Sequence, residues 1–202
     1  MLALAVTMYL AAPPAAVAAL ERGTLRLVGR FSGGHACVIA PRLALTNGHI
    51  VDPRPFDKDV PLLPFTYSDD DGGEGVVVPV PGRLEQSRDL AAVEPMGEDD
   101  EFQHYLPVAK ERPKPGDRVW LLGYDWSNKK TAMADDPIES KVTRVVALHI
   151  NFYPSGQGGS SGSCLVNEAG EVVGINEGAW PTDDGEAGSA VGVWGPYKDK
   201  LQ

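Results

Sequence analysis

The sequence predicts an all-β protein, and three of its features lead to this prediction. Apolar residues fall in short runs, and 23 glycines and 17 prolines are scattered between them, as expected where turns separate strands. An amphipathic helical pattern is absent between residue 21 and the last few residues. A chain of 202 residues is long enough for one large β domain or two small barrels. The runs expected to form strands of an antiparallel barrel or sandwich are Thr24–Val28, Cys37–Ala40, Val76–Val80, Val119–Leu122, Val142–Ile150 and Val172–Ile175.

The first twenty residues form an uncharged, mostly apolar segment. The apolar run is too short to cross a bilayer before Pro13 and Pro14 interrupt it. Its length and the small residues 16–18 are typical of a secretory signal peptide cleaved near Ala18, although no Lys or Arg precedes the apolar run. The alternative is an N-terminal segment that packs on the barrel. We expect a secreted or periplasmic protein, with a cytoplasmic location as the alternative.

Three short segments, in the order His, Asp, Ser, provide side chains for nucleophilic catalysis. They are Leu45–His49, Arg88–Val93 and Gly158–Ser163. A serine hydroxyl becomes an effective nucleophile when an imidazole takes its proton and a carboxylate fixes the tautomer of that imidazole. Glycines beside the serine let backbone N–H groups point at the oxyanion of a tetrahedral intermediate. These segments therefore contain the candidate active site.

The same segments resemble motifs of the chymotrypsin-like (trypsin-like) serine peptidases, especially the bacterial branch with the glutamyl endopeptidases and the Deg-type proteases. That family has Leu-Thr-x-x-His after an apolar strand, Asp-[Ile/Leu]-Ala before a strand, and Gly-x-Ser-Gly before a strand, a turn and another strand. These motifs occur here in the family's order and cover nearly the whole chain. The matching segments are Gly34–Ile39, Leu45–Val51, Asp89–Val93, Lys114–Tyr124 and Gly159–Ile175.

The resemblance implies a fold of two antiparallel six-stranded β-barrels with the active site in the cleft between them. Residues 21–105 are expected to form the N-terminal barrel, and residues 106–202 the C-terminal barrel. Residues 1–20 are the signal peptide or apolar segment that precedes both. The division into two barrels follows from the family, because no internal repeat is visible in the sequence.

The resemblance also implies a serine endopeptidase that works through an acyl-enzyme intermediate. Ser161 would attack the scissile carbonyl, His49 would act as the base, and Asp89 would orient His49. The N–H groups of Gly159 and Ser161 would form the oxyanion hole. This chemistry implies no cofactor and no metal, and the expected partner is a polypeptide substrate.

His49 is preferred over the other three histidines because it alone stands in the family's Thr-x-x-His motif. His35 lies in a glycine loop, His104 in an acidic loop and His149 in an apolar strand, so we expect these three to be structural or exposed.

Asp89 and Ser161 are chosen over their neighbours by local sequence. Apolar residues follow Asp89 and would bury it against an imidazole, whereas Asp69–Asp71 is a solvated run. Ser161 has glycine two residues before it and one after it, which Ser160 and Ser163 do not.

An α/β-hydrolase esterase is the main enzymatic alternative that the sequence excludes. Such an enzyme has Gly-x-Ser-x-Gly at a strand-to-helix turn, and its acid and histidine follow the nucleophile. Here Ser163 stands two residues after Ser161, and both partners precede it. Residues 165–175 read as strand, turn and strand.

The substrate pocket is predicted only in outline. Ser155 stands six residues before the nucleophile, where trypsin-like enzymes have aspartate, so a tryptic preference is not indicated. Asn176 stands where glutamyl endopeptidases have histidine, and Glu177 and Gly178 follow on the expected substrate-pairing strand. Glu177 would either face the pocket and favour basic side chains or point to solvent.

One departure from the animal digestive relatives concerns activation. They have an aspartate just before the catalytic serine, and it pairs with a new N-terminus after zymogen cleavage. Ser160 stands there in this chain, so that ion pair cannot form. We expect activity that does not depend on one exact N-terminus.

Charge and cysteine content add further expectations. The net charge of −10 disfavours nonspecific binding to nucleic acid and to anionic membranes. The acidic residues 69–74 are expected to form a solvated hairpin tip, with calcium binding as the alternative. Cys37 and Cys164 are the only cysteines, and both lie in strand-like runs, so we expect buried thiols and no disulfide.

Two functions from different classes stay open at this point. The first is an active endopeptidase without stable membrane association after processing. The second is a catalytically inactive trypsin-like module that binds proteins. The complete set of His, Asp and Ser in a glycine frame favours the first.

Overall fold

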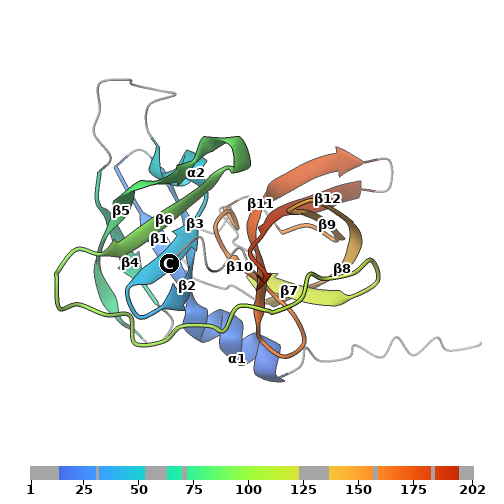
Figure 1. Cartoon of the computed structure of the whole chain (residues 1–202), viewed down its shortest axis with the longest axis horizontal. Helices are drawn as coiled ribbons and strands as arrows, with labels where there is room; N and C mark the ends of the chain where they lie inside the picture. The colour runs from blue at the N-terminus through green and yellow to red at the C-terminus, as the bar shows by residue number, and fades with distance from the viewer. Residues whose placement is uncertain are drawn as a thin grey trace, which may run out of the picture.

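The structure, a computed structural model, confirms the predicted fold class. The chain forms two closed, six-stranded antiparallel β-barrels that stand side by side (Figure 1). The structure describes residues 14–30, 32–52, 63–69, 72–122, 137–156, 159–182 and 185–195. Within these ranges, no helix is both long and apolar enough to cross a membrane.

The first barrel has the strand order β1-β2-β3-β6-β5-β4 and is closed by pairing between β1 and β4. Successive side chains of β2 point to opposite faces of the strand, and both faces are apolar. Ala36 and Val38 pack inside this barrel, whereas Cys37 and Ile39 pack toward the second barrel. The strands are β1 (Thr24–Val28), β2 (Gly33–Ala40), β3 (Leu43–Thr46), β4 (Phe65–Ser68), β5 (Glu74–Glu85) and β6 (Leu90–Pro95). A short helix, α2 (Gly48–Val51), follows β3, and a 3-10 turn, η1 (Gln86–Arg88), precedes β6.

The second barrel has the order β10-β11-β12-β9-β8-β7 and is closed between β10 and β7. Val119 and Leu121 of β7 pack inside it, and Trp120 and Leu122 between them pack toward the first barrel. The strands are β7 (Arg118–Leu122), β8 (Pro137–Val146), β9 (His149–Tyr153), β10 (Cys164–Val166), β11 (Val172–Thr182) and β12 (Gly185–Gly192).

The predicted run Val142–Ile150 differs from the structure, because it contains the turn of a hairpin. β8 ends at Val146, and β9 starts at His149. Ala147 makes the turn with a φ of 51°, a left-handed conformation that alanine rarely adopts. No glycine or asparagine marks the turn in the sequence, so the apolar pattern predicted one continuous strand.

An N-terminal helix, α1 (Pro14–Gly23), packs across both barrels at the bottom of the view in Figure 1. Ala16 and Leu20 lie one turn apart on the same side of the helix and are fully buried in the cluster between the barrels. The described part of the segment therefore packs on the fold, as the second interpretation of residues 1–20 expects. A cut near Ala18 would divide α1, and such processing stays a prediction.

The prediction that the cysteines form no disulfide is wrong. Cys37 of β2 and Cys164 of β10 are bonded to each other, with their Cα atoms 4.9 Å apart. Both side chains belong to the apolar cluster between the barrels. The sequence could not show this pairing because it joins two strands from different barrels, 127 residues apart.

A connecting segment, residues 96–117, leads from the first barrel to the second. Phe102 packs in the first barrel, Leu106 packs between the barrels, and Ala109 packs in the second. The domain boundary predicted between residues 105 and 106 falls within this connection.

Candidate active site

His49 and Asp89 lie beside each other because β3 and β6 are paired neighbours. Thr46 near the end of β3 lies opposite Ala91 near the start of β6, so the residues that extend these strands meet at one end of the barrel. His49 Nδ1 lies 2.6 Å from Asp89 Oδ2, and the backbone N–H of His49 donates to Asp89 Oδ1 at 2.8 Å. Both oxygens of the carboxylate are thus used to hold the histidine.

The backbone around Asp89 fixes this pair further. Asp89 has a φ of 49°, a left-handed conformation that aspartate tolerates better than most residues. Its carbonyl oxygen accepts hydrogen bonds from the Gly48 N–H at 3.0 Å and from Asn47 Nδ2 at 3.1 Å. The segment before α2 is therefore bound to Asp89 through both backbone and side chain.

The contact with Asp89 determines which nitrogen of His49 carries the proton. An ionised carboxylate can only accept a hydrogen bond, so Nδ1 is the donor. In a neutral imidazole, Nε2 is then left as the acceptor. This is the tautomer that a general base for a serine hydroxyl requires.

Ser161 lies in the loop before β10, which contacts both barrels. The His35 N–H on β2 donates to Ser161 O at 2.8 Å. Gly162 has a φ of 84°, and a Cβ at this position would lie 1.9 Å from His35 O. Only glycine fits there, which explains the glycine that follows the predicted nucleophile.

The hydroxyl of Ser161 donates to Glu177 O on β11 at 3.0 Å. No hydrogen bond between Ser161 and His49 is present in the part of the chain that the structure describes. The loop nevertheless crosses from the second barrel to β2 of the first, near the strand that leads to His49. The loop also includes Gly159, the second predicted oxyanion donor, with a φ of 96°. Gly158 lies outside the described residues.

The four predicted substrate-binding residues differ in exposure. Ser155 and Gly178 are partly buried, and Asn176 is fully buried. The carboxylate of Glu177 is mostly buried, accepts a hydrogen bond from Ser189 on β12, and lies 3.8 Å from His149 Nδ1. It therefore faces β12 and β9. Binding of substrate by these residues stays a prediction.

Two residues hold the Ser161 loop in ways that sequence reasoning missed. His35 is buried, and its Nδ1 lies 3.0 Å from Gly159 O. Asn176 donates to Ser160 through its side-chain amide. The position of His35 two residues before Cys37 gave no signal of this contact, because the partner loop is 124 residues away.

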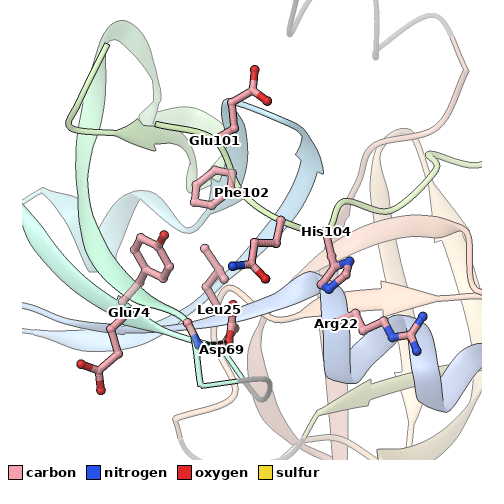
Figure 2. Close-up of a pocket in the computed structure, with 10 residues that line it drawn as sticks. Arg22, Leu25, Asp69, Glu74, Glu101, Phe102 and His104 are labelled. Carbon is pink, nitrogen blue, oxygen red and sulfur yellow. Dashed lines mark hydrogen bonds between the residues drawn. The ribbon is translucent and has the colours of Figure 1, made fainter. Parts of the chain in front are cut away.

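A small pocket of about 80 Å³ lies away from this site (Figure 2). It contains Arg22 at the end of α1, and Figure 1 shows α1 and α2 at opposite ends of the view, so the pocket is remote from His49. Asp69 closes the β4–β5 turn by accepting the Gly73 N–H at 2.6 Å. Burial, together with the charges of Asp69 and Asp100, raises the pKa of Tyr67 in the pocket wall.

The acidic residues 69–74, predicted as a solvated hairpin tip with calcium binding as the alternative, lie partly outside the described residues. Asp70 and Asp71 lie outside the described residues. In the parts that are described, no group of three or more His, Cys, Asp or Glu side chains is arranged to hold a metal ion.

Residues 34–175 match the family model of the trypsin-like peptidase domain. The chain belongs to the trypsin-like peptidase family. The match includes His49, Asp89 and Ser161, and it confirms the family that the motifs indicated. Membership of this family implies polypeptide substrates.

The fold is similar to solved structures of serine proteases. An inactive form of Rv3671c from M. tuberculosis H37Rv with a serine-to-alanine substitution is 20% identical, with a TM-score of 0.68 over 94% of this chain and 90% of that chain. A second inactive form of the Rv3671c protease is also 20% identical, with a TM-score of 0.68 over 94% and 93%. The serine endoprotease from Yersinia pestis is 19% identical, with a TM-score of 0.69 over 88% of this chain and 61% of that chain. At these identities the similarity shows the fold. No curated protein matches the sequence.

Proposed function

We propose that the chain is a serine endopeptidase that hydrolyses peptide bonds through Ser161, His49 and Asp89. The contact between His49 Nδ1 and Asp89 Oδ2, 2.6 Å long, carries this proposal because it leaves Nε2 as the acceptor. The family supports the same chemistry, since a trypsin-like domain acts on polypeptides.

The proposed cycle is acyl transfer. Ser161 attacks the scissile carbonyl while His49 takes its proton, and the N–H groups of Gly159 and Ser161 stabilise the oxyanion. His49 then protonates the leaving amine, and water hydrolyses the acyl-enzyme with His49 again as the base. The Ser161 hydroxyl bonded to Glu177 O must first rotate about its Cα–Cβ bond, a change between ordinary rotamers.

A catalytically inactive protein-binding module is the second candidate. The hydrogen bond of Ser161 to Glu177 O, in place of one to His49, favours it. Cleavage of denatured casein by the wild-type chain and by Ser161→Ala separates the two. The proposal expects cleavage by the wild type and none by the variant; a folded wild-type chain that cleaves neither casein nor a mixed peptide library would contradict it.

We also propose that the protein works outside the cytoplasm, in a periplasm or secreted. The Cys37–Cys164 disulfide supports this location, because such bonds persist mainly in oxidising compartments. Fractionation of cells that express the full chain tests the location; recovery in the cytoplasm, with both thiols reduced, would contradict it.

A further inference from the structure

Within the second barrel, the buried side chain of Asn176 supports the loop that contains Ser161. Its Nδ2 donates to Ser160 O at 2.9 Å and to Ser160 Oγ at 3.0 Å. Because Ser160 O can only accept a hydrogen bond, the Asn176 side chain must present its Nδ2 rather than its Oδ1 to the loop. The backbone of Asn176 adds two bonds: its N–H donates to Ser163 O at 3.0 Å, and its carbonyl accepts the Gly162 N–H at 2.8 Å.

The bond to Ser160 O sets the direction of the next N–H group, that of Ser161. In a trans peptide, the C=O of one residue and the N–H of the next point in opposite directions. Among the described residues, the only cis peptide joins Tyr153 and Pro154, so this rule holds between Ser160 and Ser161. Because Ser160 O faces the buried Asn176, the Ser161 N–H points away from it, and no described residue accepts a hydrogen bond from this group.

We propose that Asn176 is a positioning residue that holds the Ser161 N–H in place as an oxyanion donor. This inference rests on the proposed peptidase function and deepens it. Asn176 does not touch the substrate in this role; it acts through the Ser160–Ser161 peptide. Its fully buried position fits a support beneath the loop.

The network explains how the loop keeps its shape with serine at position 160. A buried carboxylate without a partner would be strongly unfavourable, and so would a buried ammonium group. The amide of Asn176 satisfies the hydroxyl and the carbonyl of Ser160 without any charge. No α-amino group from a cut N-terminus is needed to complete it.

The first barrel holds the neighbouring carbonyl groups of the same loop. His35 bonds to Gly159 O through Nδ1 and to Ser161 O through its backbone N–H. Ser160 O, between them, is held by Asn176 and also by the Ser163 N–H at 3.1 Å. Without the amide, the Ser160 carbonyl loses the shorter of its two bonds named here and keeps the one from the Ser163 N–H, so the plane of the Ser160–Ser161 peptide can tilt while the fold stays intact.

The test measures steady-state kinetics of Asn176→Leu, which keeps the branched shape and the number of heavy atoms and removes the donor. We expect kcat to fall about ten- to a hundred-fold, less than the loss of an oxyanion donor itself, with KM changed less than about threefold. The affinity for a peptide trifluoromethyl ketone, which forms an oxyanion on the serine, should fall in parallel with kcat. A role in folding alone would not produce this parallel loss in molecules with wild-type circular dichroism.

Two variants in the same loop serve as matched controls. Ser163→Ala removes a fully buried hydroxyl from the same loop; this hydroxyl has no hydrogen-bond partner among the described residues, so kcat should stay within about twofold of the wild type. Ser160→Ala keeps the carbonyl bond and loses only the hydroxyl, so its loss should be smaller than that of Asn176→Leu.

Asn176→Asp provides a second variant should the leucine variant fail to fold. Burial favours its protonated form, whose hydroxyl can still donate to Ser160 O, whereas the ionised form cannot. Its kcat relative to the wild type should therefore fall as the pH rises through the pKa of this acid. Wild-type kcat for folded Asn176 variants over the whole pH range would overturn the positioning role. A folded wild-type chain without any activity would instead contradict the proposed function itself and remove the basis of this role with it.

Discussion

The two halves of the candidate site are held in different ways. His49 and Asp89 lie in one barrel and are bound by their own side chains, which are 51% and 32% exposed. The Ser161 loop is bound mainly through its backbone carbonyl groups, by donors from both barrels. Cys164, which forms the disulfide between the barrels, is only three residues after Ser161.

This difference indicates how substitutions in each half of the site should reduce activity. The tautomer of His49 depends on one short contact, from Nδ1 to Asp89 Oδ2, so a change of one atom should disable the pair without disturbing the fold. The serine loop depends on several contacts that fix the barrels relative to each other, so it should fail gradually as that arrangement loosens. The predictions below separate these two kinds of failure.

The largest effect is expected from Asp89→Asn. The amide can present its N–H₂ group to His49 Nδ1, which favours the wrong tautomer of the imidazole. We expect kcat to fall about 10³–10⁴-fold, with little change in the melting temperature. Peptide hydrolysis and thermal unfolding of the same sample measure both. A melting temperature that falls together with kcat would mean that this pair is also a major structural contact.

Loss of the disulfide should act on the other half through stability. Replacing both cysteines, Cys37→Ala with Cys164→Ala, removes a link between residues 127 positions apart and should lower the free energy of unfolding by about 2–5 kcal/mol. Urea unfolding of this variant and of the oxidised wild type gives the difference. Equal stability would show that the apolar cluster alone holds the barrels together.

The N-terminal helix should make a smaller contribution of the same kind. Leu20→Ala removes a fully buried side chain between α1 and the barrels and should lower the free energy of unfolding by about 2–3 kcal/mol, as measured by urea unfolding.

Forms of the chain that begin at Ala19, Glu21 or Gly23 should have lower melting temperatures than the full chain but similar activity per folded molecule. A hundred-fold difference in that activity between neighbouring starts would reveal a specific N-terminal contact with the site.

The smallest effect is expected from Glu139→Gln, a carboxylate control for Asp89. Glu139 accepts two hydrogen bonds from Arg118 on the neighbouring strand, and this contact lowers the pKa of Glu139. A lowered pKa stabilises the fold above the pKa of the unfolded chain, and the contribution is lost as the pH falls through the folded value. Because the pair is exposed, the loss should be below about 1 kcal/mol near neutral pH and should vanish in acid, with kcat unchanged. Unfolding curves at neutral and acidic pH measure it; a larger loss would place this pair among the main supports of the barrel.

Much of the fold and of the His49–Asp89 arrangement was predictable from the sequence because the signals are local. Leu45–His49 and Asp89–Val93 each combine a strand with its functional residue, and β3 pairs with β6 as the family fold requires. The glycine frame of Ser161 likewise reflects a local need, since Gly162 has to lie against His35 O.

The remaining contacts could not be predicted, because they join residues that are distant in sequence. The disulfide and the bond of His35 to Gly159 O both cross between the barrels. The bond from Asn176 to Ser160 depends on the register of β10 against β11, which includes a bulge. The turn at Ala147 was missed for a different reason, since alanine is an unusual residue for its backbone conformation.

The identity of the nucleophile is the central claim, and covalent labelling tests it most directly. The wild-type chain is treated with a fluorophosphonate, digested, and the modified residue is located by mass spectrometry. Because only a serine activated by His49 should react, the label is expected on Ser161 alone and should be absent from Ser161→Ala and strongly reduced in Asp89→Asn. A label on Ser160 or Ser163, or a label that persists in Ser161→Ala, would contradict the account.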